Sequence, residues 1–242
     1  MNIEFVTNCD CVKSDNIIIK IKECIGYIFG NNLYQSKYIK KVVLNTPKDS
    51  EKPIELDEKN KILTLSIEES NNFIFYEVCR QLQHIKNVNK KIYDTKVSIR
   101  YPFVYKFIDE YLCYSNSMEY ILNTQVINDS QEMLEYKNYL LESIEGYNSY
   151  LTDNVHILKE ILSVNCLEEG KETIEESGVS DLITKTAYIL AVINVIKLKD
   201  FDIELSTLLI ELDTLEAPIT TKDCKLIQSS LDIVVTKELA TV

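Results

Sequence analysis

Residues 75–82 of the chain read FYEVCRQL, and this stretch decides how the first half of the sequence is interpreted. It belongs to a predicted helix over residues 70–87, in which apolar residues recur at spacings of three and four. The run directly before it, residues 62–67 (ILTLSI), has the apolar and β-branched composition of a strand. The change from one pattern to the other predicts a small sheet that leads into a helix.

The residues before this stretch predict a strand, a helix, a second strand and a hairpin. Short strands are expected at residues 3–6 and 41–45, and a helix between them carries apolar residues three and four apart after a capping Ser14. Two apolar runs flank the polar residues 57–60, which is the pattern of a hairpin.

The residues after this stretch are almost all helical in pattern. One helix is expected from Pro102 to about Leu122, and an acidic loop is expected over residues 167–178. Further helices are expected at residues 130–165, 180–199, 203–216 and 221–239. The predicted fold class is α+β, with a small N-terminal sheet followed by a mostly α-helical C-terminal half. The predicted domains are residues 1–125 and 126–242.

Charge and composition exclude several classes of function. The 242 residues contain 26 Lys and Arg against 38 Asp and Glu, which gives a net charge of −12 and disfavours direct nucleic-acid binding. The longest apolar run, residues 187–196, is too short to span a bilayer, so no membrane segment is expected. Seven scattered cysteines and the absence of a secretory leader favour a cytoplasmic protein of a reducing compartment.

A second helix follows the first by about 30 residues and carries FIDEYLC at residues 107–113. The order of strands, hairpin and two such helices resembles zincin-like metallopeptidases of the gluzincin type, over roughly residues 1–123. In that family, the first helix carries His-Glu-x-x-His, in which the two histidines bind zinc and the glutamate is the general base. A carboxylate on the second helix is the third ligand.

The resemblance implies a degenerate metal site in this chain. Tyr76 stands at the first histidine, Glu77 at the general base, Arg80 at the second histidine and Glu110 at the third ligand. A guanidinium has no lone pair for zinc and a neutral phenol is a poor ligand, so no metal, no cofactor and no catalysis are expected. Arg80 is expected to fill the former metal space and pair with Glu110.

Two other interpretations of these residues stay open. Glu77, Arg80 and Glu110 are also compatible with ordinary charges on solvated helix faces. A different metal site, from Glu77, His84 and either Glu110 or Asp109, requires two ligands about 10.5 Å apart along one helix, which is too far for one ion unless the helix bends.

The function implied is that of a protein–protein interaction module built on an inactive peptidase, within a multi-protein complex or a homo-oligomer. In active relatives, an extended peptide adds to an edge strand beside the active-site helix, and that edge is expected here at residues 62–67 or 41–45. Protein partners with neutral or basic faces are expected because the chain is acidic. The alternatives are a metal-dependent hydrolase with altered ligands, and a helical adaptor unrelated to peptidases.

Overall fold

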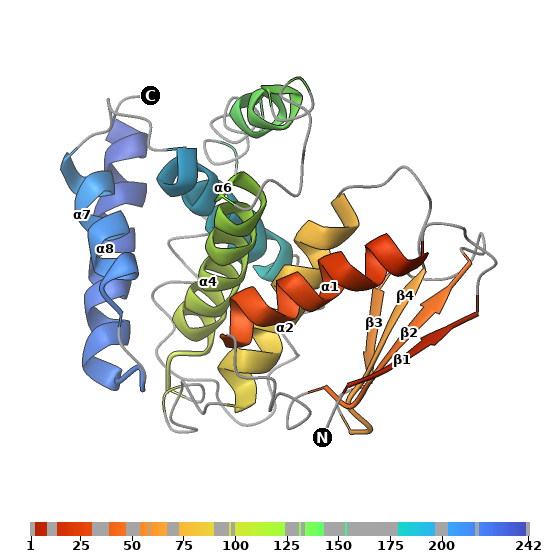
Figure 1. Cartoon of the computed structure of the whole chain (residues 1–242). Coiled ribbons are helices and arrows are strands. Elements are labelled where there is room, and N and C mark those ends of the chain that lie inside the picture. Colours follow the sequence, from red (N-terminus) through yellow and green to blue (C-terminus); the bar gives the residue numbers. More distant parts are fainter. Residues whose placement is uncertain are drawn as a thin grey trace. The chain divides into compact units, whose positions relative to one another are not determined.

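A computed structural model shows an α+β protein with a small N-terminal sheet and a helical C-terminal half (Figure 1). The predicted α+β class is therefore confirmed. The structure describes residues 3–8, 14–30, 39–46, 54–57, 59–66, 73–89, 97, 100–123, 131, 134–142, 153, 179–196, 203–215 and 218–240.

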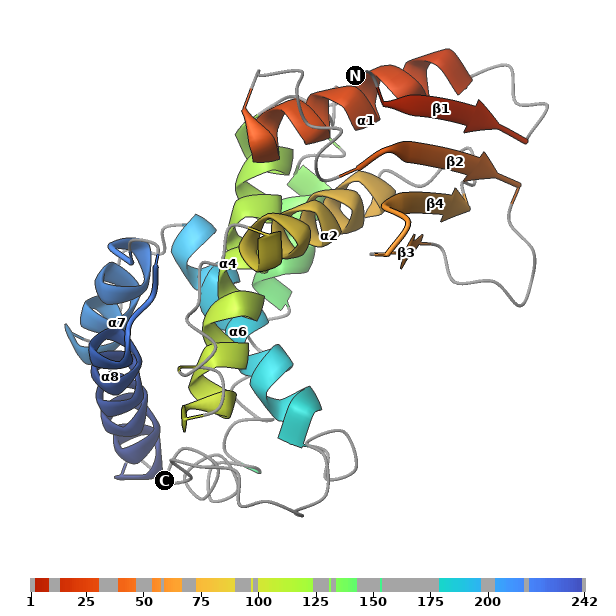
Figure 2. The same ribbon diagram turned by 90° about the horizontal axis from the view of Figure 1, so that it is seen from below.

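The sheet has four strands in the order β1-β2-β4-β3 (Figure 2). The strands are β1 (Glu4–Thr7), β2 (Lys41–Asn45), β3 (Ile54–Asp57) and β4 (Ile62–Ser66). β1, β2 and β4 are parallel, and β3 pairs antiparallel with β4, so that these two strands form the predicted hairpin.

The strand order corrects the prediction that residues 62–67 or 41–45 form the free edge. β2 and β4 are both internal, because β4 leaves the hairpin to pair with β2 on its other side. The edges are β1 and β3, and β3 is the antiparallel one.

One face of the sheet is buried. Val42 lies beside Leu63 and Leu44 beside Leu65 in the parallel register, and all four side chains are fully buried. Neighbouring residues in register point to the same side of a sheet, so these four form one apolar layer. Burial of each such side chain stabilises the fold by about 1.5–3 kcal/mol.

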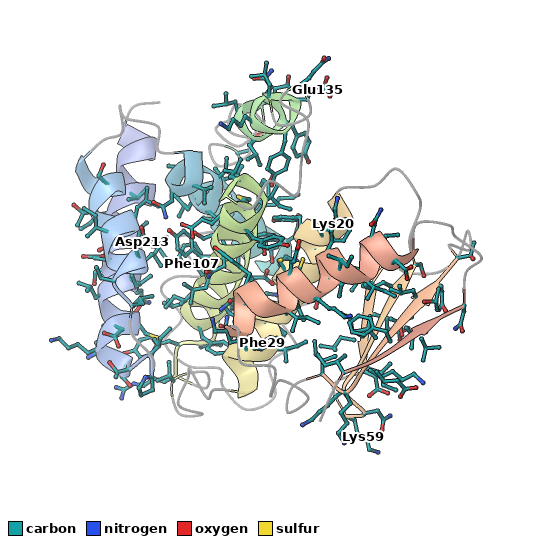
Figure 3. All side chains as sticks on the ribbon, viewed as in Figure 1. Lys20, Phe29, Lys59, Phe107, Glu135 and Asp213 are labelled. Carbon is teal, nitrogen blue, oxygen red and sulfur yellow. The ribbon has the colours of Figure 1, made fainter. Side chains whose placement is uncertain are left out.

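Helices α1 (Ser14–Phe29) and α2 (Phe73–Asn89) pack on each other and lie on the same side of the sheet (Figures 1 and 2). The Nζ atom of Lys22 on α1 lies 5.1 Å from the ring centroid of Phe5 on β1, and α2 contacts β3. Lys20, which Figure 3 labels on α1, lies 5.2 Å from the ring centroid of Phe75 on α2. These contacts place α1 over one edge of the sheet and α2 over the other.

Two buried thiols meet in the interface between α1 and α2. The thiols of Cys24 and Cys79 are hydrogen-bonded, and both side chains are fully buried. Burial raises the pKa of the Cys79 thiol well above its usual value, and the Cys24 thiol raises it further. The Cys79 thiol therefore stays protonated, and both cysteines pack as small apolar residues of the core.

The chain divides into two compact units. The first comprises residues 1–89 and 116–133, and the second comprises residues 90–115 and 134–242, so that α4 (Pro102–Asn123) contributes residues to both. The predicted division into residues 1–125 and 126–242 stays a prediction.

The second unit contains α6 (Val179–Ile196), α7 (Ile203–Asp213) and α8 (Thr221–Ala240). α7 and α8 pack against each other, and the Oγ atom of Ser230 on α8 donates a hydrogen bond of 2.5 Å to Glu211 on α7. The Tyr111 hydroxyl on α4 donates to Asp213, which Figure 3 labels on α7, at 3.1 Å. The Asn194 amide on α6 donates to the same carboxylate at 2.9 and 3.1 Å, so one acidic side chain joins three helices.

Only part of the predicted helix over residues 130–165 can be compared. Residues 134–142 are helical, and most of the remainder lies outside the described residues, as does the acidic loop predicted for residues 167–178. Among the described residues, no helix is both long enough and apolar enough to cross a membrane.

Candidate functional site

Three of the predicted site residues lie on α2, at the border between its buried and its solvent-facing side. Tyr76, Glu77 and Arg80 are each half-buried. The helix places them there because its apolar residues recur every three or four positions and turn towards the core. That buried stripe consists of Phe75, Val78, Cys79, Leu82 and Ile85.

The Glu77 carboxylate accepts three hydrogen bonds. Arg80 donates from Nε to Oε2 at 2.8 Å and from Nη2 to Oε1 at 2.7 Å, and Gln81 donates from Nε2 to Oε1 at 2.9 Å. The Arg80 and Glu77 side chains are 22% and 32% exposed, so water only partly screens this ion pair. Both oxygens of this carboxylate are therefore bound to fixed donors.

The fourth predicted site residue, Glu110, is half-buried on the part of α4 that belongs to the second unit. Its expected pairing with Arg80 stays a prediction. Arg80 pairs with Glu77, one helical turn before it, because residues three apart on a helix are neighbours.

The alternative metal ligands are also divided between the units. His84 is half-buried on α2 in the first unit, whereas Asp109 is buried on α4 in the second. Cys113, buried one turn after Asp109, adds a further ligand type on the same helix. The alternative metal site from Glu77, His84 and a carboxylate of α4 would therefore draw its ligands from both units, and it stays a hypothesis that the spacing along α2 disfavours.

The sequence reasoning missed the free edge of β3, which we call the β3 edge and define as the outer side of Ile54–Asp57. In the part of the chain that the structure describes, β3 pairs with β4 alone. Its apolar residues Ile54 and Leu56 are half-buried, and its acidic residues Glu55 and Asp57 are exposed. Since α2 contacts β3, this edge lies beside the helix that carries Tyr76, Glu77 and Arg80.

A tight turn fixes the end of the β3 edge. Asp57 accepts hydrogen bonds from the backbone N–H of Asn60 at 2.9 Å and from its side-chain amide at 2.7 Å. These bonds lower the pKa of Asp57 below its usual value. The next residue, Lys61, has a φ of +61°, in the left-handed region that a non-glycine residue adopts at a cost. Lys59 marks this turn in Figure 3.

A concave feature lies along α1, away from the β3 edge residues Ile54–Asp57. It is an open hollow of about 660 Å³, and its lining contains none of the predicted site residues. The lining residues are Ile19, Lys22, Glu23, Gly26, Tyr27, Gly30 and Tyr120. The rings of Tyr27 and Tyr120 lie 5.0 Å apart at its wall, and burial raises the pKa of both hydroxyls.

No protein-family model, no curated protein and no solved structure matches the chain. The assignment of a site therefore rests on the geometry of its residues. Two features carry that assignment, namely the charge pair on α2 and the β3 edge beside it.

Proposed function

We propose that this chain is a catalytically inactive, zincin-like interaction module that takes up an extended peptide of a partner protein along the β3 edge. The observation that carries the proposal is the contact between an antiparallel edge strand and the helix with Tyr76, Glu77 and Arg80. In zincin-like peptidases, as noted above, an edge strand beside the active-site helix binds the peptide.

The hydrogen bonds that Arg80 donates to the Glu77 carboxylate support the proposal that the protein is catalytically inactive. A general base must accept a proton from a metal-bound water, and the metal must be held by three protein ligands. Here the carboxylate at the position of the base is bound by Arg80, whose cationic group cannot serve as a ligand. The same cation offsets the negative charge that zinc would otherwise neutralise.

The shape of the sheet supports peptide uptake. An edge strand presents N–H and C=O groups that a further strand can pair with, and an extended peptide gains main-chain hydrogen bonds by joining it. With only four residues, β3 offers a short edge, which suits weak and reversible binding.

The setting that we propose is a multi-protein complex in the cytoplasm. Cys24, Cys79, Cys113 and Cys224, the four of the seven cysteines that the structure describes, are free thiols, which fits a reducing compartment. The net charge of −12 favours partners with neutral or basic faces.

Selective backbone methylation of a peptide tests the proposal. The probe is a capped heptapeptide of alternating valine and serine, and binding is followed by NMR titration of the full-length protein. In a bound strand, the N–H groups of alternate residues point to the same side. N-methylation of one alternate set should therefore abolish binding, while N-methylation of the other set should leave it unchanged. Equal effects of both sets, or no binding of the parent peptide, would overturn strand addition.

Elemental analysis separates this proposal from the alternative of a hydrolase with altered ligands. The purified full-length protein should contain far less than one transition-metal ion per chain. A stoichiometry near one metal per chain, together with peptide cleavage that a chelator abolishes, would favour the hydrolase.

A further inference from the structure

We infer that the strand added to the β3 edge alternates cationic and apolar residues, with the cationic residues on the face of Glu55. This inference rests on the proposed function and names the chemistry of the partner peptide. It follows from the two faces of β3, which differ sharply in chemistry.

The first face of β3 is apolar and turns towards the helices. Ile54 lies opposite Leu65 and Leu56 opposite Leu63 in the register with β4, and both leucines are fully buried. Residues directly opposite each other point to the same side of a sheet, so Ile54 and Leu56 extend the buried layer. An added strand would place every second residue against this layer, and an apolar side chain would bury area there.

The second face of β3 is acidic and open. Glu55 and Asp57 are both exposed, and Glu55 lies opposite Thr64, an uncharged residue. Its diagonal neighbours on β4, Ile62 and Ser66, are also uncharged. An added strand would therefore supply the nearest cross-strand charge to Glu55.

The two acids are not equivalent. Both oxygens of the Asp57 carboxylate accept hydrogen bonds from Asn60. The Glu55 carboxylate has neither an ion pair nor a hydrogen bond with any of the described residues. Glu55 is therefore the main determinant of charge preference, and a lysine or arginine directly opposite it is the complementary side chain.

The test compares three capped heptapeptides that share valine at alternate positions and carry lysine, serine or glutamate between them. At low ionic strength, the lysine peptide should bind the full-length protein about tenfold more tightly than the glutamate peptide, with the serine peptide between them. The difference should shrink at high salt because exposed charges are screened.

The variant Glu55→Lys should reverse the order of the lysine and glutamate peptides. The matched control is Asp232→Lys on α8, which changes the net charge by the same amount at another exposed position. In this control, the lysine peptide should still bind more tightly than the glutamate peptide. The circular dichroism spectrum shows whether each variant is folded. If Glu55→Lys does not fold, Glu55→Gln serves instead and should remove the preference.

The outcomes separate this inference from the proposed function. Equal affinity for all three peptides, with binding still abolished by one set of N-methyl groups, would overturn the charge preference and leave strand addition intact. Absence of binding for all three would overturn both. A third outcome is that Asp232→Lys removes the preference for the lysine peptide as effectively as Glu55→Lys does. This result would assign the preference to the overall charge of the protein and would overturn the role of Glu55.

Discussion

At the scale of the residue, Gly30 shows how one position ends α1. Its φ is +80°, and a Cβ atom placed on it would meet no heavy atom of the described residues within 4 Å. The cost of a side chain at Gly30 is therefore conformational and not steric. We expect Gly30→Ala to lower the free energy of unfolding by about 1 kcal/mol, measured by urea denaturation. Gly30→Asn should cost less, because asparagine tolerates this conformation, and an alanine variant as stable as the native protein would contradict the account.

Asp57 gives a prediction about pH. Hydrogen bonds from Asn60 lower its pKa in the folded protein, so the carboxylate stabilises the hairpin turn at pH values above its ordinary pKa of 3.8. That contribution should be lost as the pH falls through the lowered pKa of the folded state. NMR titration of the Asp57 carboxyl carbon should give a midpoint below 3.8, and Asn60→Ala should raise it. An identical midpoint in the native protein and the variant would contradict the role of Asn60.

At the scale of the element, the sheet distinguishes an internal strand from an edge strand. Leu63 on β4 is fully buried, whereas its cross-strand neighbour Leu56 on β3 is half-buried. We expect Leu63→Ala to lower the free energy of unfolding by about 3 kcal/mol, because it leaves a cavity in the buried layer. Leu56→Ala should cost about 1 kcal/mol, because less apolar area is removed from its site. Equal costs in urea denaturation would contradict the assignment of β3 as an edge.

The sequence predicted the elements of the first unit better than their arrangement. Periodicity and polar turn residues are local signals, and they placed the strands, the hairpin and both helices close to their observed bounds. The pairing of β4 with β2 is a contact between distant segments, and alternation on one strand does not reveal its neighbours. A local signal for the edge did exist in β3, because short strands with exposed charges, such as Glu55 and Asp57, are typical of sheet edges.

For the candidate site, as for the sheet, the sequence predicted local placement and not long-range contacts. Position on one helix followed from spacing, so Tyr76, Glu77 and Arg80 are found together on α2. The expected pairing of Arg80 with Glu110 stays a prediction, and the spacing of three also made Glu77 a neighbour of Arg80. Pairing across 30 residues depends on tertiary packing, which helical periodicity does not encode.

At the scale of the whole molecule, the resemblance to zincin-like peptidases predicts that a metal site can be restored. The double variant Tyr76→His and Arg80→His should bind about one zinc ion per chain, measured by calorimetry and elemental analysis, because two imidazoles and Glu110 would provide three ligands. Each single variant should bind zinc much more weakly, and adding Glu110→Gln to the double variant should abolish binding. A folded double variant without zinc affinity would contradict the resemblance.

Amide hydrogen exchange of the full-length protein, with and without the heptapeptide of alternating valine and lysine, tests the β3 edge most directly. The amides of Ile54–Asp57 that do not pair with β4 should exchange more slowly in the presence of the peptide, because the added strand accepts their hydrogen bonds. The amides of the opposite edge, Glu4–Thr7, serve as the internal control and should be unaffected. Protection of Glu4–Thr7 or of helical amides by bound peptide, with Ile54–Asp57 unchanged, would contradict the account.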